Sequence, residues 1–238
     1  MTCEREASIL SLGHKAETLI EELKAAANFE NFLNGDQDYY DWLWDNSKSI
    51  PEHIGFANGA TRFVFWDKDE PSYVFKINIY HHDDIDYGKQ EVYIYNKAVE
   101  QGVEEHFAWA AKVYSYGAND VYAMEYCSVD CDRTSSESWE YHARAICEEE
   151  NWDFDHLSDE EQEQLQCYVE DSEYAQTTGM LEFARSQMSR DEFHDFYDFI
   201  TDMDINDLHC GNWGYRNCDK LVLVDYAGYE RDLMGRIA

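Results

Sequence analysis

The segment DLHCGN at positions 207–212 is followed by an apolar stretch, LVLV at positions 221–224, that runs directly into Asp225. Phosphoryl transfer uses a carboxylate to orient the attacking hydroxyl group and oxygen ligands to hold Mg²⁺ against the phosphates. Asp207 fits the first role, and Asn212 and Asp225 fit the second. A polar turn before an ordinary hairpin has the same composition, so the rest of the chain must decide between the two interpretations.

A lysine lies within an apolar stretch further upstream, YVFKI at positions 73–77. Alternate side chains of a strand point to opposite faces, so Val74 and Lys76 share one face. A lysine there either extends to solvent from an edge strand or holds an anion. The Asn58-Gly59 turn leads into the apolar stretch at positions 63–66. Turn, strand and lysine strand therefore follow one another as in a hairpin that covers a nucleotide.

The next feature is a predicted helix over residues 89–99, with Gly102 as its C-cap. Glu91 lies near its start, where it can pair with Lys76. In a chain this acidic, a solvated glutamate is the ordinary alternative. The spacing to Lys76 and the tyrosine-rich apolar face of the helix favour the ion pair.

The stretch VYAMEYC at positions 121–127 predicts a strand whose end resembles the hinge of protein kinases. Met124 takes the gatekeeper position in this comparison. A hinge contacts adenine through the backbone, so the implied contacts are the carbonyl group of Glu125 and the amide group of Cys127. An ordinary sheet strand would look the same in isolation.

These motifs occur in the order that a two-lobed kinase fold requires. The chain resembles the small early serine/threonine protein kinases of T-odd lytic bacteriophages. The resemblance rests on Asp-x-His-x-Gly-Asn from Asp207 to Asn212, the strand-end Asp225, and the spacing of the Asn58-Gly59 turn to Lys76, and it covers roughly residues 55–127 and 193–229. It implies phosphorylation of serine or threonine in host proteins, with ATP and Mg²⁺ as cofactors, in the host cytoplasm.

The resemblance also implies a role for each matched residue. The catalytic residues would be Asp207, Lys76 and Glu91, and the metal ligands Asn212 and Asp225. The nucleotide would be bound by Gly59, Arg62, Val64, Val74, Lys76, Met124, Glu125 and Cys127. The chain departs from the kinase pattern in its loop, where Arg62 stands at a usual glycine position and can reach a phosphate, and at Asp225-Tyr226-Ala227, which replaces Asp-Phe-Gly.

The charge of the chain is extreme, with a formal net value of -33 over 238 residues. No Lys or Arg occurs between Arg144 and Arg185, while acidic residues accumulate from Glu148 to Glu173. Such a field repels nucleic acid and attracts basic proteins. A docking surface for a basic host partner and a solubility device are both consistent with this pattern.

Composition excludes several other classes. No stretch approaches the ~20 apolar residues of a membrane span, and the first residues do not form a signal peptide. The seven cysteines are an odd number with no pattern typical of zinc ligands, which favours free thiols in a cytoplasmic protein.

We therefore predict a compact, two-lobed, protein kinase-like α+β fold. Residues 1–52 would form an N-terminal helical extension, residues 53–127 the small lobe, and residues 128–238 a truncated large lobe with an acidic helical insertion. Two other functions remain open. One is a catalytically degenerate kinase fold that binds a basic host protein or mimics nucleic acid, and the other is a small-molecule kinase or nucleotidyl transferase.

Overall fold

The computed structural model describes residues 2–33, 39–58, 62–78, 86–117, 119–129, 131–171 and 173–227. These residues form two compact units. The first contains the described residues up to Tyr95 and those from Trp109 to Tyr126, and the second contains residues 96–108 and the described residues from Cys127 onward.

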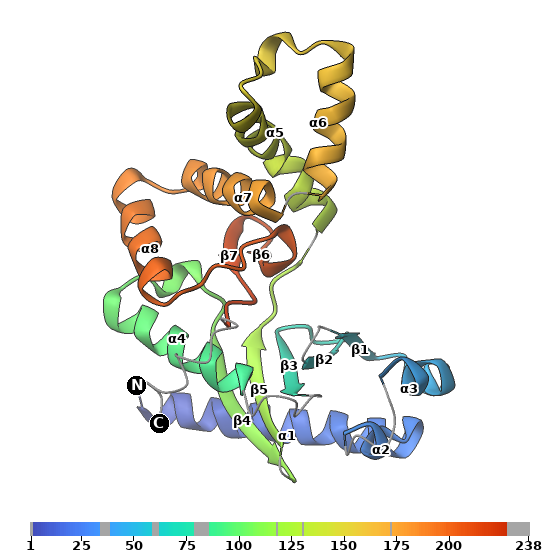
Figure 1. Ribbon diagram of the computed structural model, residues 1–238. Coiled ribbons are helices and arrows are strands. Elements are labelled where there is room, and N and C mark those ends of the chain that lie inside the picture. Colours follow the sequence, from blue (N-terminus) through green and yellow to red (C-terminus); the bar gives the residue numbers. More distant parts are fainter. Residues whose placement is uncertain are drawn as a thin grey trace. The chain divides into compact units, whose positions relative to one another are not determined.

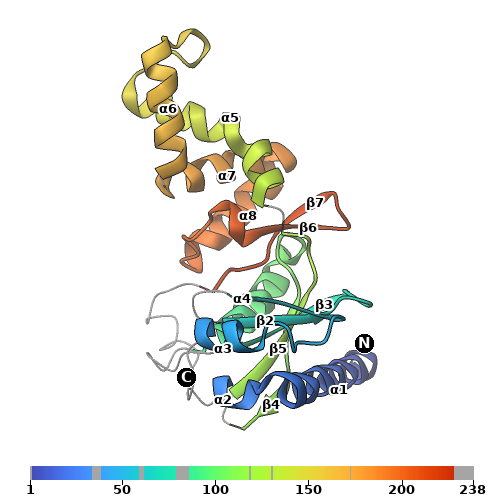
Figure 2. The ribbon, with the colours of Figure 1, turned by 90° about the vertical axis from the view of Figure 1, so that its right-hand side faces the viewer.

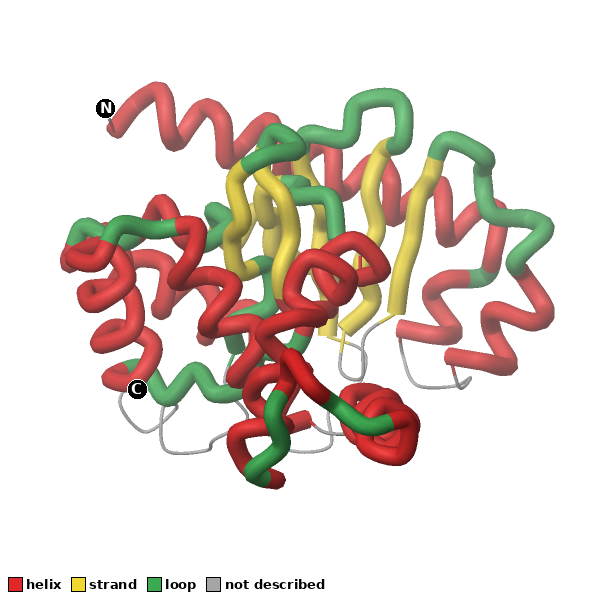
Figure 3. The backbone as a smooth tube through the Cα atoms, turned by 90° about the horizontal axis from the view of Figure 1, so that it is seen from above, coloured by secondary structure: helices red, strands yellow, loops and turns green. Residues whose placement is uncertain are grey.

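The first unit is built on a five-stranded antiparallel sheet with the strand order β1-β2-β3-β5-β4 (Figure 1, Figure 3). The strands are β1 (Ile54–Asn58), β2 (Arg62–Asp67), β3 (Tyr73–Asn78), β4 (Ala110–Tyr116) and β5 (Asn119–Glu125). Strand β3, which carries Lys76, lies at the centre of this order. The predicted α+β class is therefore confirmed.

Three helices cover one face of the sheet: α1 (Thr2–Ala27), α2 (Phe29–Leu33) and α3 (Tyr39–Asn46). Their apolar residues form one buried core with Phe75 and Ile77 of β3 and with Val121 and Ala123 of β5. Trp42 of α3 is fully buried, and its indole Nε1 donates to the carbonyl of Ala27 at 2.6 Å. The helical N-terminal segment that the sequence predicts thus shares a core with the sheet.

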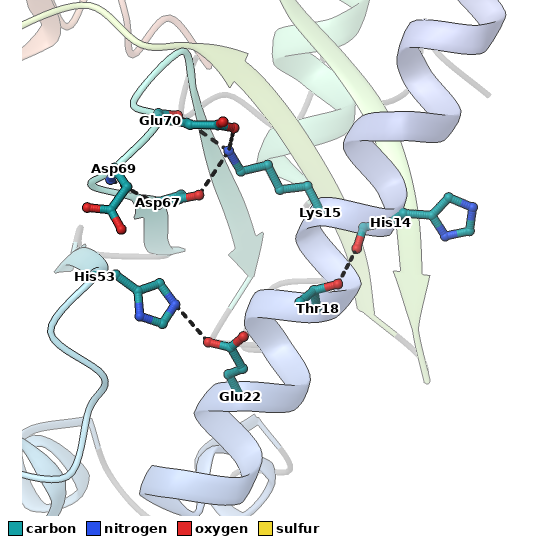
Figure 4. Close-up of polar contacts among 8 residues, drawn as sticks. All are labelled: His14, Lys15, Thr18, Glu22, His53, Asp67, Asp69 and Glu70. Atoms are coloured by element: carbon teal, nitrogen blue, oxygen red, sulfur yellow. Dashed lines mark hydrogen bonds and ion pairs between the residues drawn. The ribbon is translucent and has the colours of Figure 1, made fainter.

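Polar contacts also join α1 to the sheet (Figure 4). Lys15 Nζ lies 3.0 Å from Asp67 Oδ2 at the end of β2 and 3.0 Å from Glu70 Oε2 in the following turn. His53 Nε2, just before β1, lies 2.8 Å from Glu22 Oε2. Burial alone would lower the pKa of Lys15, but its hydrogen bonds to Glu70 and Asp67 outweigh burial and raise it. The same contact with Lys15 lowers the pKa of Asp67.

Helix α4 (Tyr87–Gln101) carries Glu91, and its first turns lie on the side of the sheet opposite α1 (Figure 2). The helix ends at Gly102, whose φ of 78° lies in the left-handed region that favours glycine. Val103 N then donates to the carbonyl of Ala98 at 3.0 Å, as in a Schellman C-cap. The predicted helix and its C-cap are confirmed.

The second unit is mostly helical. Its elements after α4 are η1 (Glu104–His106), α5 (Cys131–Glu150), η2 (Phe154–His156), α6 (Asp159–Asp171), α7 (Glu173–Gln187), α8 (Arg190–Asp202), η3 (Cys210–Asn212), β6 (Trp213–Arg216) and β7 (Lys220–Leu223). Strands β6 and β7 form an antiparallel hairpin. Phe107 packs against Phe199 and Tyr226, with ring centroids 5.2 and 5.3 Å apart, so α8 and the segment after the hairpin share a core.

The residues that the structure describes include no helix of the length and apolar character that crossing a membrane requires. Cys147, Cys167 and Cys210 are free thiols.

Candidate functional site

The first set of candidate residues surrounds the carboxylate of Glu91. Lys76 Nζ lies 2.9 Å from Glu91 Oε1, and Arg62 Nη1 lies 2.8 Å from Glu91 Oε2. All three side chains are buried, with exposed fractions of 6 % for Lys76, 1 % for Glu91 and 5 % for Arg62. The ion pair between Lys76 and Glu91 is therefore present, as the spacing predicts. The contact between Arg62 and Glu91 is one that the sequence analysis did not anticipate.

Strand register explains why these side chains meet. Lys76 of β3 lies opposite Val64 of β2 on one side and opposite Tyr122 of β5 on the other. Directly opposed residues of antiparallel strands point to the same face of a sheet. The neighbours of Lys76 in the strand, Phe75 and Ile77, enter the core beneath α1. Lys76 therefore faces the other side of the sheet, where Glu91 of α4 contacts it.

The period of two also places Arg62 on this face. Arg62 and Val64 are separated by one residue of β2, so their side chains point the same way. This signal was available in the sequence. The kinase resemblance instead implies that Arg62 replaces a loop glycine and reaches a phosphate. Gly59, the glycine of that turn, lies outside the described residues.

The predicted hinge follows β5. Met124 is buried and lies opposite Val74 of β3, which is half-buried. Glu125 N donates to the carbonyl of Trp109 at 2.9 Å, and Tyr126 N donates to that of Ser72 at 3.1 Å. These bonds extend the sheet ladder up to the last residue of the first unit.

Cys127 is buried and is the first residue of the chain's long segment in the second unit. The chain therefore passes from one unit to the other within the predicted hinge segment. The next residue, Ser128, forms an isolated antiparallel bridge with Tyr215 of the hairpin.

The second set of candidate residues lies entirely within the second unit. Asn212 Nδ2 donates to the backbone carbonyl of Asp207 at 2.8 Å. The backbone carbonyl of Asn212 accepts from Val224 N at 2.9 Å and from Asp225 N at 3.4 Å. Asn212 is buried, whereas Asp207 and Asp225 are partly exposed. The structure thus brings together the three residues that the sequence spacing singles out, with Asn212 between the two aspartates.

The local fold of the 207–213 segment holds this arrangement. His209 caps the short helix η3, and its Nδ1 accepts from Gly211 N at 3.1 Å. Trp213 is fully buried and anchors the far end, because its Nε1 donates to the carbonyl of Leu208 at 3.0 Å. His209 Nε2 lies 3.5 Å from Asp207 Oδ1. Since Nδ1 acts as an acceptor, the neutral ring carries its proton on Nε2, the nitrogen that lies near Asp207. No pattern in the sequence indicates this contact.

The donor set suits a small hard cation. Because the Asn212 amide nitrogen is used in the bond to Asp207, its oxygen is the atom that remains for a metal. An amide oxygen together with the Asp225 carboxylate matches the ligands that Mg²⁺ takes in sites where substrate phosphates complete the coordination. In the described part of the chain, no group of three or more His, Cys, Asp or Glu residues is arranged to hold a metal ion. The candidate site has two carboxylates, Asp207 and Asp225.

No protein-family model matches the chain, and no curated protein is significantly similar to it.

Proposed function

We propose that this protein is an ATP- and Mg²⁺-dependent phosphotransferase with a protein kinase-like fold, and that it phosphorylates serine or threonine in a protein. The observation that carries the proposal is the buried contact between Lys76 and Glu91, 2.9 Å apart on the central strand of the sheet. The joined set of Asp207, Asn212 and Asp225 supplies the other parts that phosphoryl transfer needs.

A buried ion pair is a poor choice for stability alone. Removing two charges from water costs several kcal/mol per ion, roughly as much as their attraction returns. What the pair does provide is a fixed ammonium group, because Glu91 holds Lys76 from a helix while the strand holds its backbone. Positioning and electrostatic stabilisation are the main contributions of a protein to phosphoryl transfer. Lys76 is therefore assigned to the phosphates of ATP and Glu91 to holding Lys76.

The second set is assigned to the acceptor and the metal. Asp207 would accept the proton of the attacking hydroxyl group as the new bond forms between that oxygen and the γ-phosphorus. The bond from the γ-phosphorus to the bridging oxygen breaks at the same time, and ADP leaves. Asn212 and Asp225 would hold Mg²⁺, which when bound supplies positive charge against the phosphate oxygens. His209, in contact with Asp207, would keep its carboxylate oriented.

The proposed substrate class follows from the resemblance to the early bacteriophage protein kinases and from the charge of the chain. The carboxylates exposed on the end of α5, on η2 and on α6 form what we term the acidic surface: Glu148, Glu149, Glu150, Asp153, Asp155, Asp159, Glu160 and Glu163. We propose that it docks a basic host protein. An arginine of the chain already lies against this surface, since the Arg144 guanidinium is 4.3 Å from the centre of the Phe154 ring and 3.6 Å from Asp155 Oδ1.

Transfer assays with labelled ATP test the proposed activity. Incubation with γ-labelled ATP and host proteins should label serine or threonine, and α-labelled ATP should not label protein. Asp207→Asn should reduce transfer by at least about a hundredfold while leaving ATP affinity largely unchanged, because general base contributions are typically of that size. Lys76→Met should reduce both phosphoryl transfer and the affinity for ATP.

A matched control is available on the same sheet. Lys112 of β4 is also a strand lysine paired with a carboxylate, that of Asp120, but it is exposed. Lys112→Met should therefore retain transfer. Label from α-labelled ATP would instead identify a nucleotidyl transferase, and label only in a small molecule would identify a small-molecule kinase. Wild-type protein that binds a host protein without any transfer would identify a binding protein.

Calorimetry tests the metal assignment separately. ATP should bind at least about tenfold more weakly in EDTA than in Mg²⁺, because a single lysine cannot neutralise a triphosphate within so acidic a protein. Asn212→Ala and Asp225→Ala should each remove most of this difference. Equal affinity in EDTA and in Mg²⁺ would contradict the assignment of Asn212 and Asp225.

A further inference from the structure

The carboxylate of Asp86, just before α4, joins three elements of the first unit. Its Oδ1 accepts from Lys89 N at 3.0 Å, which caps the N-terminus of α4. The same oxygen accepts from Asn78 Nδ2 of β3 at 3.2 Å. Its Oδ2 accepts from the hydroxyl group of Tyr122 on β5. One side chain therefore connects the start of α4, the helix that carries Glu91, to the neighbouring strands β3 and β5.

The first turn of α4 also lies directly on Tyr122. A Cβ atom built on Gly88 would come within 2.2 Å of the Tyr122 ring, so any larger residue would displace the helix or the ring. Tyr122 is itself buried, with 4 % of its surface exposed. Both the ring and the hydroxyl group of Tyr122 thus hold the start of α4, the ring by contact with Gly88 and the hydroxyl group through Asp86.

This attachment lies next to the proposed phosphate-binding lysine. Tyr122 is the residue of β5 directly opposite Lys76 of β3, so both side chains face α4. Glu91 follows Asp86 in the same helical segment and reaches Lys76 at 2.9 Å. A shift or rotation of the first turns of α4 would therefore change the Lys76–Glu91 contact directly.

We infer that Asp86 is a positioning residue, which together with Tyr122 fixes α4 so that Glu91 holds Lys76 where the phosphates of ATP bind. The inference rests on the proposed function for its effect on ATP. Its structural part, that Asp86 controls the Lys76–Glu91 contact, can be measured without nucleotide. The hydrogen-bond partners of Asp86 come from β3, α4 and β5, so its effect is not confined to one element.

The first experiment measures the reactivity of the Lys76 amine toward an acylating reagent in the free protein, by mass spectrometry, with exposed Lys68 as the internal reference. Asp86→Ala removes the cap and the bond to Tyr122, so Lys76 labelling should rise about fivefold to tenfold. Asp86→Asn keeps an acceptor suited to an N-cap and should restore most of the protection. Tyr122→Phe keeps the ring against Gly88 and should raise labelling less, by about twofold to threefold.

The matched control is Tyr114→Phe. Tyr114 lies on the neighbouring strand β4, and its hydroxyl group donates to Glu17 Oε1 of α1 at 3.1 Å. This variant loses the same kind of bond on the face of the sheet that α1 covers. It should leave Lys76 labelling unchanged. A rise in Lys76 labelling equal to that of Tyr122→Phe would show that loss of any such bond loosens the sheet, and would overturn the inference.

The second experiment measures MgATP affinity by calorimetry. Asp86→Ala should weaken binding by about fivefold to tenfold in the wild-type chain but by less than about twofold in a Lys76→Met background, because the effect passes through Lys76. A lower unfolding temperature with unchanged Lys76 labelling and unchanged affinity would overturn the inference. Increased labelling in a protein that binds no ATP would support the control of the Lys76–Glu91 contact and refute the proposed function instead.

Discussion

Glu91 is the residue on which the first site depends most, because two buried cations contact its carboxylate. Removing one partner of a buried ion pair is more costly than replacing the whole pair, since it leaves a charge in an apolar environment. The three members of this cluster are therefore not equivalent. Lys76 and Arg62 share the carboxylate of Glu91, and each contacts one of its two oxygens.

Unfolding in denaturant should show this asymmetry. We expect Glu91→Gln to lower the free energy of unfolding by about 3 kcal/mol or more, in the range found for broken buried pairs. Lys76→Met and Arg62→Met should each cost less, because Glu91 keeps one cation. A cost for Glu91→Gln that is smaller than that of Lys76→Met would contradict the arrangement.

The lowered pKa of His106 makes the stability of the fold depend on pH. His106 is buried, with 5 % of its surface exposed, and its ring packs against Phe196. Burial lowers the pKa of His106 despite the nearby carboxylate of Glu105. The charged groups around it also include Lys220, Glu192 and Arg216. A histidine with a lowered folded-state pKa stabilises the fold above its unfolded pKa of about 6.5, and that stability is lost as the pH falls through the folded-state value.

The measurement is the free energy of unfolding between pH 7.5 and 5. It should fall as the pH drops below about 6.5, by at most about 1.4 kcal/mol per pH unit for a single group. His106→Phe should flatten this slope while retaining the contact with Phe196. An unchanged slope would place the titrating group elsewhere.

At the residue scale, sequence reasoning predicted contacts correctly where the repeat of a strand or the spacing along a helix relates the two positions. It predicted the Lys76–Glu91 contact from strand alternation and helix spacing, and it singled out Asp207, Asn212 and Asp225, which the structure joins through hydrogen bonds. It missed Asp86, because the partners of this residue come from three elements whose packing no local pattern specifies. The role of Gly59 stays a prediction, since that residue lies outside the described part of the chain.

Among the elements, strand β4 shows why some segments escaped sequence analysis. Its pairing with β5 shifts register between Lys112 and Tyr114. A bulge of this kind breaks the alternation of buried and exposed side chains on which strand prediction relies. Strands β2, β3 and β5 keep regular pairing within the central sheet, and their apolar stretches were recognised. The acidic segment that the sequence predicts to be helical contains helices α5, α6 and α7.

Helix α1 provides a prediction at the same scale. Lys15→Met removes the contacts with Asp67 and Glu70 that join α1 to the end of β2. Because Lys15 is partly exposed, the loss should be modest, about 0.5–1 kcal/mol of unfolding free energy near pH 7. Asp67 has a lowered pKa, so its share of this stability is present above its ordinary pKa and is lost as the pH falls through the folded-state value.

The free energies of unfolding of wild type and Lys15→Met should therefore converge as the pH falls below the ordinary pKa of Asp67 toward its lowered folded-state value. Thr18→Ala is a suitable control on the same helix. Its hydroxyl group bonds only within α1, to the carbonyl of His14, so its effect should not vary over this pH range in the same way. A Lys15→Met effect that does not decrease as the pH falls from 7 to 3 would assign it to packing instead.

On the scale of the whole molecule, charge is the dominant property. A net charge of -33 creates a field that extends beyond any single contact, and the acidic surface concentrates it on α5, η2 and α6. Fields of this kind accelerate the association of oppositely charged partners, and salt screens them beyond about 8 Å at physiological ionic strength. The chemistry assigned to Lys76 and Asp207 does not require this surface.

Neutralising five of its residues tests the docking proposal. Replacing Glu148, Glu149, Glu150, Glu160 and Glu163 together by Gln should slow association with a basic host target by about tenfold at low salt and reduce the salt dependence of the rate. A control variant carries the same change in charge at exposed positions elsewhere: Asp41, Glu52, Asp69, Asp195 and Asp202 replaced by Asn or Gln. Equal slowing by the two variants would assign the effect to net charge alone.

The core beneath the sheet has a consequence for how the protein is made. Helix α1 is synthesised before β5, yet the residues that share its apolar core include Val121 and Ala123 of β5, about a hundred positions later in the chain. Contacts so distant in sequence form slowly, and exposed apolar surface promotes aggregation in the meantime. A nascent chain that stops before β5 cannot complete this core. Premature termination between α1 and β5 should therefore yield fragments that bind chaperones.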